Sequence, residues 1–163
     1  VLGHLGAEIP PTQVAFALAK RLGFDWGAEA AYDALDCNRL ASGDVDVVTT
    51  TIQQMMPCLD RVTILASVTS ERLTMAPDAP TVAEVVPDLS LVLWNGLFVR
   101  KEVGADVRDK IAAVAAATMA SDRARKFAAD TGAQIYWQGA ADAAARIAAD
   151  RATLAAIGAI VAE

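Results

Sequence analysis

Short apolar runs that alternate with helical patterns constrain the fold of this chain more than any other feature. The clearest run, residues 45–49, is rich in β-branched side chains and lies between Gly43 and a threonine cluster, which is typical of a buried strand. Alternation of strands with helices predicts an α/β fold with a mainly parallel sheet. Further strands are expected at residues 1–5, 28–32, 62–68, 89–99 and 134–138, and helices at residues 10–22, 34–42, 52–59, 105–129 and 140–163.

One more helix start is predicted from a four-residue pattern. Thr81-Val82-Ala83-Glu84 has the Ser/Thr-x-x-Glu form of a capping box. In such a box the hydroxyl and the carboxylate each accept a hydrogen bond from a free amide of the first turn. We therefore expect a helix to begin at Thr81.

Composition and charge exclude several classes of protein. Hydrophobic residues make up 55% of the 163 residues and charged residues 21%, which is typical of a globular chain. The net charge is −6 and no run of basic residues is present, so nucleic acid is not an expected partner. The apolar stretches are shorter than the ~20 residues that span a bilayer, so direct membrane insertion is not expected either. The first residues do not form a signal peptide, which we expect to have been removed or to lie outside this chain.

The two cysteines, Cys37 and Cys58, lack the C-x-x-C spacing of a zinc or redox site. We interpret them as two small buried thiols, with a structural disulfide as the alternative if the protein is exported. No metal site is predicted.

Catalysis has little support in this sequence. His4 is the single histidine, and it lies in a predicted strand without a second ligand or an obvious triad partner, so we expect a structural role for it. No nucleotide-binding or hydrolase motif is present. We therefore predict neither an enzyme nor a cofactor, and a small α/β enzyme that uses His4 and Asp46 is the weakest alternative.

Two polar segments are placed where an α/β sheet binds ligands. Residues 6–12 and 49–51 each follow a predicted strand and precede a helix, and ligands of α/β proteins bind at such strand ends. Free amides at a helix start and threonine hydroxyls hold a carboxylate without the help of lysine or arginine. The candidate ligand-binding residues in these segments are Gly6, Ala7, Ile9, Pro10, Thr12, Thr49, Thr50 and Thr51.

Five segments, taken in order, carry a family resemblance. The most specific is PDAPTVAE at residues 77–84, which is similar to a "PDVPTVAE" motif. The others are Tyr32, GDVDV at residues 43–47, RVTILASVTSER at residues 61–72 and WNGLF at residues 94–98. They resemble the tyrosine of a "PY.G" turn, "GQVDV", a strand ending in "LAVTS..R", and "W.GLF". All of these belong to the substrate receptors of tripartite tricarboxylate transporters, the Bug-type periplasmic binding proteins. The resemblance adds Tyr32 to the candidate ligand-binding residues.

The resemblance implies a periplasmic-binding-protein-like (type II) fold of two α/β lobes that close on a carboxylated ligand. Residues 1–93 would form the second lobe, nearly complete, and residues 94–163 would return through the hinge as the C-terminal part of the first lobe. The opening strands of that first lobe have no counterpart here, so we expect this sequence to lack the N-terminal part and to bind its ligand weakly by itself. The implied function is a periplasmic receptor that passes a small carboxylated solute, such as a di- or tricarboxylate, to the membrane subunits of a tripartite transporter.

The sequence also departs from the family pattern. Glu8, Ile9 and Thr12 stand where the family usually has a small polar loop and a histidine, and Thr50 stands where an acidic residue often follows the "VDV" strand. Glu8 would repel a carboxylate, so we expect it to face solvent unless the ligand also bears an amine. The alternative function is the effector-binding domain of a cytoplasmic transcription regulator, which uses a similar two-lobed sensor.

Overall fold

The computed structural model describes all of residues 1–163 and divides them into two compact units. Unit 1 comprises Val1–Leu93 together with Ala149–Glu163, and unit 2 comprises Trp94–Ala148. Residues 149–163 therefore group with the N-terminal part of the chain. The assignment of residues 1–93 and 94–163 to the two lobes of a receptor stays a prediction.

Unit 1 is built on a three-stranded parallel sheet. Its strands are β1 (Leu2–His4), β2 (Glu29–Ala31) and β3 (Val47–Val48), in the order β2-β1-β3. Leu2 pairs with Glu29 of β2 and with Val47 of β3. All three residues of β1 are buried, as expected of a central strand, whereas the edge strand β2 is largely exposed. The predicted α/β fold with a parallel sheet is confirmed.

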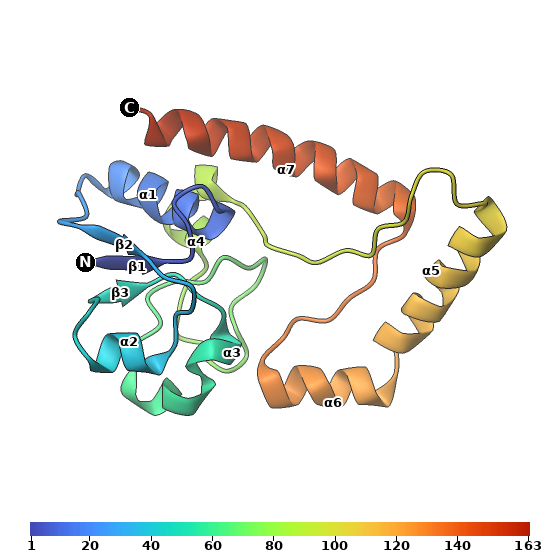
Figure 1. The fold of residues 1–163 in the computed structure, drawn as a ribbon, viewed down its shortest axis with the longest axis horizontal. Coiled ribbons are helices and arrows are strands. Elements are labelled where there is room, and N and C mark those ends of the chain that lie inside the picture. Colours follow the sequence, from blue (N-terminus) through green and yellow to red (C-terminus); the bar gives the residue numbers. More distant parts are fainter. The chain divides into compact units, whose positions relative to one another are not determined.

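The helices between these strands cover both faces of the sheet (Figure 1). Helix α1 (Pro10–Leu22) joins β1 to β2 and packs on one face, and α2 (Cys37–Ala41) joins β2 to β3 on the other. Proline suits the first turn of α1, and Gly23 ends this helix in the left-handed conformation with φ 74°. After β3 follow α3 (Ile52–Met55) and the 3₁₀ helix η1 (Met56–Arg61).

The capping box at Thr81 is present and begins helix α4 (Val82–Val85). The Glu84 N–H donates to Thr81 Oγ1 at 3.2 Å, and the Thr81 N–H donates to Glu84 Oε2 at 2.7 Å. The helix is only four residues long because Val86 precedes Pro87, and a residue before proline disfavours the helical conformation. A 3₁₀ turn, η2 (Pro87–Leu89), follows.

The core of unit 1 lies where α1 meets the last part of α7 (Ala140–Val161) and the segment around α4. Burial of these apolar side chains is the main force that holds residues 149–163 to the N-terminal part of the chain. The core cluster consists of Val14, Ala17, Val82, Val86, Leu89, Leu91, Ile157 and Ile160.

Unit 2 is helical and contains no strand. Its elements are α5 (Ala105–Met119), α6 (Asp122–Thr131) and the first part of α7. One residue is buried in α5 and one in α6, Ala115 and Ala124. None of the helices of the chain combines the length and the hydrophobicity needed to cross a membrane.

Three predicted strands are wrong. Residues 62–68, 89–99 and 134–138 form no strand, and their one ladder contact is an isolated bridge between Ser67 and Thr81. An apolar run becomes a strand only where a neighbouring strand completes its ladder of hydrogen bonds, and these runs have none. The predicted helix 105–129 is divided into α5 and α6, because the Ser121 hydroxyl accepts the Ala124 N–H and caps a new helix.

Candidate functional site

The carboxyl ends of β1 and β3 lie next to each other, because the two strands are adjacent and parallel. The chain leaves β1 toward α1 on one face of the sheet, whereas α2, on the other face, leads into β3. A strand order of 2-1-3 therefore places a topological switch point between β1 and β3, where α/β sheets bind ligands. The Thr49 N–H donates to the Gly3 carbonyl at 3.0 Å and keeps the end of β3 beside β1. The two predicted segments, residues 6–12 and 49–51, both begin at this point.

The loop that follows β1 is held by its own hydrogen bonds. The Gly6 N–H donates to Nδ1 of His4 at 3.1 Å, and Gln13 Nε2 donates to the Ala7 carbonyl at 2.6 Å. Gly6 has a φ of +152°, a conformation that side chains rarely adopt. The loop therefore has one defined path between β1 and α1.

The start of α1 offers fewer free amides than the sequence analysis predicted. Pro10 has no N–H, nor does the proline that follows it, and the N–H groups of Thr12 and Gln13 both donate to the Ile9 carbonyl, at 3.0 and 3.1 Å. In this loop the N–H groups of Ala7 and Glu8 have no partner in the structure. The first turn of α1 therefore adds no free amide, and the backbone donors of an anion site at this point would come from the loop before the helix.

The threonines of the two segments differ in what their hydroxyls do. Thr12 is fully buried, and its Oγ1 and that of Thr49 are the two buried side-chain polar atoms of the structure without a hydrogen-bond partner. Thr50 donates its hydroxyl to the Leu35 carbonyl at 3.0 Å and so holds the chain before α2. Thr51 is exposed and precedes α3 without capping it. Two hydroxyls are therefore left over, one in each segment.

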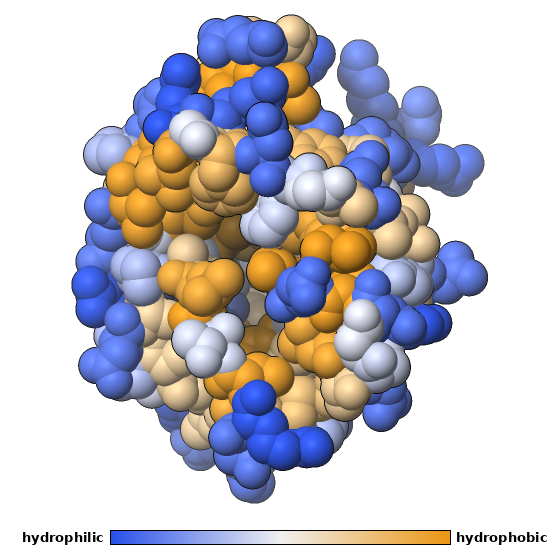
Figure 2. All heavy atoms as spheres, turned by 90° about the vertical axis from the view of Figure 1, so that its left-hand side faces the viewer, coloured by the Kyte–Doolittle hydropathy of each residue, from blue (hydrophilic) through white to orange (hydrophobic).

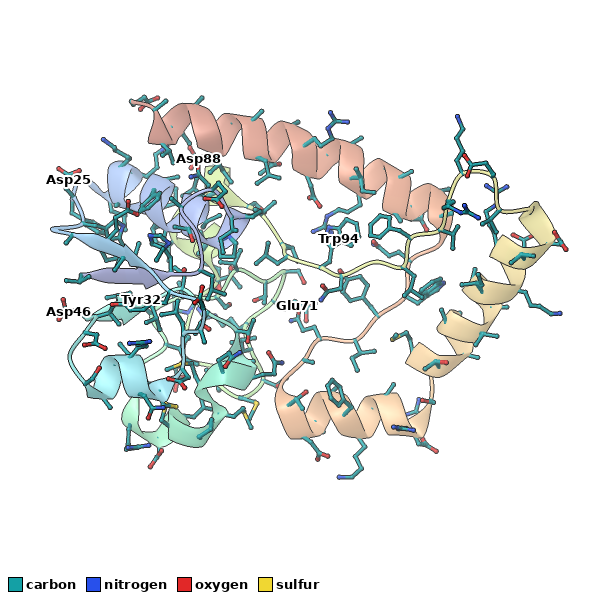
Figure 3. All side chains as sticks on the ribbon, viewed as in Figure 1. Asp25, Tyr32, Asp46, Glu71, Asp88 and Trp94 are labelled. Atoms are coloured by element: carbon teal, nitrogen blue, oxygen red, sulfur yellow. A yellow bond between two sulfur atoms is a disulfide. The ribbon has the colours of Figure 1, made fainter.

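Tyr32 lies at the same edge of the sheet, directly after β2. Its N–H donates to the His4 carbonyl at 2.9 Å, and the Arg39 guanidinium lies 4.6 Å from the centre of its ring. Arg39 also donates to Asp44 Oδ2 at 3.1 Å. The structure thus brings the residues after all three strands to one edge, whereas Asp25 and Asp46 lie at the amino-end edge (Figure 3).

The amino-end side of unit 1 faces the viewer in Figure 2. Hydrophilic residues follow the outline of this side, and apolar residues lie between them. Leu22, the last residue of α1, and Phe24, between α1 and β2, are 52% and 41% exposed.

His4 has the structural role that was predicted for it. It is buried, its Nε2 donates to Glu29 Oε2 at 2.8 Å, and its Nδ1 accepts from Gly6. Both ring nitrogens are therefore occupied, and the ring lies edge-on to Phe16 with 6.1 Å between centroids. Asp46 precedes β3 at the opposite edge of the sheet, so the structure does not bring together the residues of the enzyme alternative.

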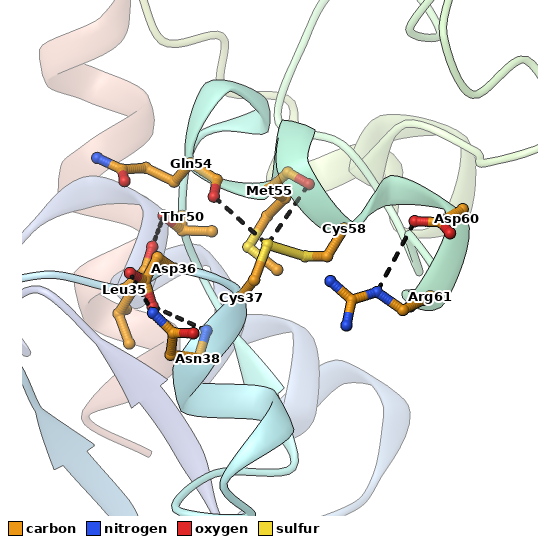
Figure 4. The surroundings of a disulfide bond; sticks show 10 residues. All are labelled: Leu35, Asp36, Cys37, Asn38, Thr50, Gln54, Met55, Cys58, Asp60 and Arg61. Atoms are coloured by element: carbon orange, nitrogen blue, oxygen red, sulfur yellow. Dashed lines mark hydrogen bonds and ion pairs between the residues drawn. A yellow bond between two sulfur atoms is a disulfide. The ribbon is translucent and has the colours of Figure 1, made fainter.

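The two cysteines form a disulfide, which corrects the prediction of two free thiols (Figure 4). Cys37 of α2 and Cys58 of η1 have Cα atoms 6.0 Å apart, within the usual range for a bridge. The Cys37 sulfur also contacts the carbonyl oxygens of Gln54 and Met55 at 3.9 and 3.8 Å, and these are not hydrogen bonds because a disulfide sulfur carries no hydrogen. The closed loop contains β3 and residues 49–51. In the sequence, the even number of cysteines is the feature that indicates this disulfide.

No group of three or more histidine, cysteine, aspartate or glutamate side chains is placed to hold a metal ion. The candidate site consists of hydroxyls, loop amides and one aromatic ring at the carboxyl edge of a parallel sheet. Groups of this kind are suited to orienting a polar solute, and none of them is a nucleophile with an adjacent base.

A parallel α/β unit with its free polar groups at the switch point belongs to the class of ligand-binding α/β proteins. Within this class, the model of the tripartite tricarboxylate transporter family receptor matches residues 29–163, and the chain therefore belongs to that family. No curated protein and no solved structure matches it. The resemblance found at residues 77–84 and in the other four segments is confirmed.

Family membership defines the general role of the protein. It is an extracytoplasmic solute receptor of the periplasmic-binding-protein-like fold, and it works with the membrane subunits of a tripartite transporter. The family is one of receptors and not of enzymes. The match favours this role over the effector-binding domain of a transcription regulator.

Proposed function

We propose that this receptor captures a small carboxylated solute, such as a di- or tricarboxylate or a related organic anion, at the carboxyl edge of the unit 1 sheet. The observation that carries the proposal is the pair of buried hydroxyls without a partner, Thr12 and Thr49. They lie in the two segments that follow the neighbouring strands β1 and β3. The ligand site comprises Gly6, Ala7, Ile9, Pro10, Thr12, Tyr32, Thr49, Thr50 and Thr51.

Unpartnered buried hydroxyls support a ligand site because they cost stability in the absence of a ligand. A buried donor without an acceptor destabilises a fold by about 1–3 kcal/mol, and a carboxylate supplies the missing acceptor. The N–H groups of Ala7 and Glu8 add two backbone donors in the same loop. Together the two hydroxyls and the two amides hold a carboxylate through neutral donors. The aromatic ring of Tyr32, directly after β2, lines the site.

The disulfide between Cys37 and Cys58 supports a site of action in the periplasm. Disulfides form and persist in oxidising compartments and are rare in the bacterial cytosol. The receptor is therefore exported and collects its solute outside the inner membrane. Residues 1–93 form most of one ligand-binding lobe, and residues 94–163 were predicted to contain the hinge and the C-terminal part of the other. Of these, residues 149–163 pack with the first lobe.

Calorimetry tests the carboxylate proposal directly. The protein produced from its complete gene is titrated with succinate, glutarate, citrate, aspartate, glutamate and, as uncharged references, glucose and glycerol. We expect saturable binding of at least one carboxylate and none of the references. If no carboxylate binds while a reference does, or if nothing in the panel binds, the carboxylate proposal is overturned.

A pair of conservative variants tests the site itself. Thr12→Val and Thr49→Val each remove a hydroxyl and keep the shape of the side chain, so the free energy of unfolding should stay equal or rise. Affinity for the carboxylate should fall by about tenfold, the value of one hydrogen bond to a charged group. Thr153→Val on α7 is the control, since its hydroxyl already donates to the Ala149 carbonyl. Unchanged affinity in both site variants would remove these hydroxyls from the site.

A further inference from the structure

We propose that the ligand carries an ammonium group as well as a carboxylate, and that Glu8 is the residue that selects it. The proposal rests on the function proposed above and narrows its ligand class to amino acids and similar zwitterions. Glu8 is an acidic side chain in the loop that would hold the ligand.

Glu8 lies in the β1–α1 loop, two residues before α1, and has an unpaired carboxylate. Its side chain is exposed and makes no hydrogen bond or ion pair in the structure. The carboxylate does not point away from the loop: a Cβ atom placed on Gly6 would lie 3.2 Å from Glu8 Oε1 and 3.5 Å from its carboxyl carbon. Glu8 was predicted to face solvent, and it is exposed, yet its charge lies over the loop.

Other acidic residues add to the negative charge of Glu8 in the segments that follow the three strands. The residues between β1 and α1 contain Glu8, those between β2 and α2 contain Asp33 and Asp36, and those between β3 and α3 are three threonines. Asp36 caps α2 by accepting the Asn38 N–H, and Asp33 is exposed. No lysine or arginine occurs in these three segments. These three segments therefore carry carboxylates and no basic side chain.

Arg39 of α2 is a basic side chain that contacts the candidate site residue Tyr32. Its guanidinium lies over the Tyr32 ring, but its charge is already paired with Asp44 at 3.1 Å. It therefore does not neutralise Glu8. The three segments and Arg39 therefore offer neutral donors for one carboxylate and no unpaired cation for a second one.

A ligand with only carboxylates would bring its charge close to Glu8 without compensation. An ammonium group on the same ligand would instead donate to Glu8 while its carboxylate binds the Thr49 hydroxyl and the loop amides. A hydrogen bond between two charged groups is stronger than one between neutral groups, and it discriminates against a ligand that lacks the donor. Glu8 thereby acts as a specificity-determining residue.

Matched ligand pairs test this proposal. Aspartate is succinate with one added ammonium group, and glutamate is glutarate with the same addition. Calorimetry on the protein produced from its complete gene should give at least about tenfold tighter binding for one of the two amino acids than for its matched diacid. The Glu8→Gln variant should lose most of this preference, because the amino acid binds more weakly and the diacid more tightly.

Asp25→Asn is the control, because it removes one negative charge at the opposite edge of the sheet. It should leave the preference unchanged, and thermal unfolding should show that both variants fold. A diacid or citrate that binds the wild-type protein more tightly than either amino acid would overturn the inference and leave the carboxylate function standing. Equal losses for both members of a pair in Glu8→Gln would also overturn it. Absence of binding by every carboxylate would instead overturn the proposed function on which it rests.

Discussion

Arg72 and Glu84 are joined by a bidentate ion pair. Arg72 Nη2 donates to Glu84 Oε1 at 2.8 Å, and Arg72 Nε lies 3.0 and 3.1 Å from the two carboxylate oxygens. Because Oε2 of the same carboxylate accepts the Thr81 N–H, the pair fastens the loop before α4 to the capping box. The pKa of Glu84 is lowered from 4.5 to about 2. The hydrogen bond from Arg72 is the largest cause, and the hydrogen bond from the Thr81 backbone is the second.

This pKa predicts how stability depends on pH. A carboxyl whose pKa is lower in the folded than in the unfolded state stabilises the fold above the unfolded pKa, here 4.5, and its contribution is lost as the pH falls toward about 2. Glu84→Gln should therefore be less stable than the wild type above pH 4.5, with a difference that shrinks and vanishes near pH 2. Urea unfolding over this range measures it. Glutamine can still close the capping box, so a difference that stays constant with pH would contradict the ion-pair account.

The capping box itself predicts a second difference. Thr81→Ala removes the oxygen that accepts the Glu84 N–H, and the loss of such a cap costs about 1 kcal/mol of stability. Thr81→Ser keeps the oxygen and should retain most of that energy. Denaturant unfolding of the two variants compares them. If alanine and serine destabilise equally, the effect comes from the lost methyl group of this buried side chain and not from the cap.

The last part of α7 should contribute strongly to the stability of unit 1. Ile157 is fully buried in the cluster with Val14 and Ala17 of α1, so Ile157→Ala should lower the free energy of unfolding by about 2–5 kcal/mol. Val114→Ala on α5 is the matched control, since Val114 is 63% exposed and its truncation should change stability by less than about 0.5 kcal/mol. Equal effects of the two variants would contradict the grouping of residues 149–163 with unit 1.

The elements that the sequence predicts well are those with a local cause. Pro10 and Gly23 mark the two ends of α1, and Thr81 with Glu84 marks the start of α4, because proline, glycine and the capping pair act on the backbone next to them. The strand at residues 62–68 fails for the opposite reason. A strand depends on a partner that the local sequence does not contain, and only Ser67 finds one, in Thr81.

The candidate site divides in the same way. The sequence places residues 6–12 and 49–51 at strand ends, and the shared edge follows from the parallel order of β1 and β3. The sequence does not predict which of these hydroxyls lack a hydrogen-bond partner. Thr50 donates to the carbonyl of Leu35, a residue far from it in sequence, whereas the hydroxyl of Thr49 has no partner. The shortage of amides at α1 was readable from the sequence, since Pro10 and Pro11 have no N–H to offer.

The disulfide between Cys37 and Cys58 predicts a response of both stability and binding to reduction. In the chain-entropy model a bridge over a separation of 21 residues stabilises a fold by about 3 kcal/mol, because it restricts the unfolded chain. Reduction should therefore lower the free energy of unfolding by about that amount. The closed loop carries β3 and the threonines of the candidate site, so ligand affinity should also fall on reduction even at temperatures where the protein stays folded.

Chemical unfolding and calorimetry with and without a thiol reductant measure these two effects. The double variant Cys37→Ala, Cys58→Ala is the control, since it should be as unstable as the reduced protein and should not respond to the reductant. A reduced protein with lower stability but unchanged affinity would show that the bridge supports the fold without positioning residues 49–51. A wild-type protein that responds to the reductant in neither measurement would contradict the bridge itself.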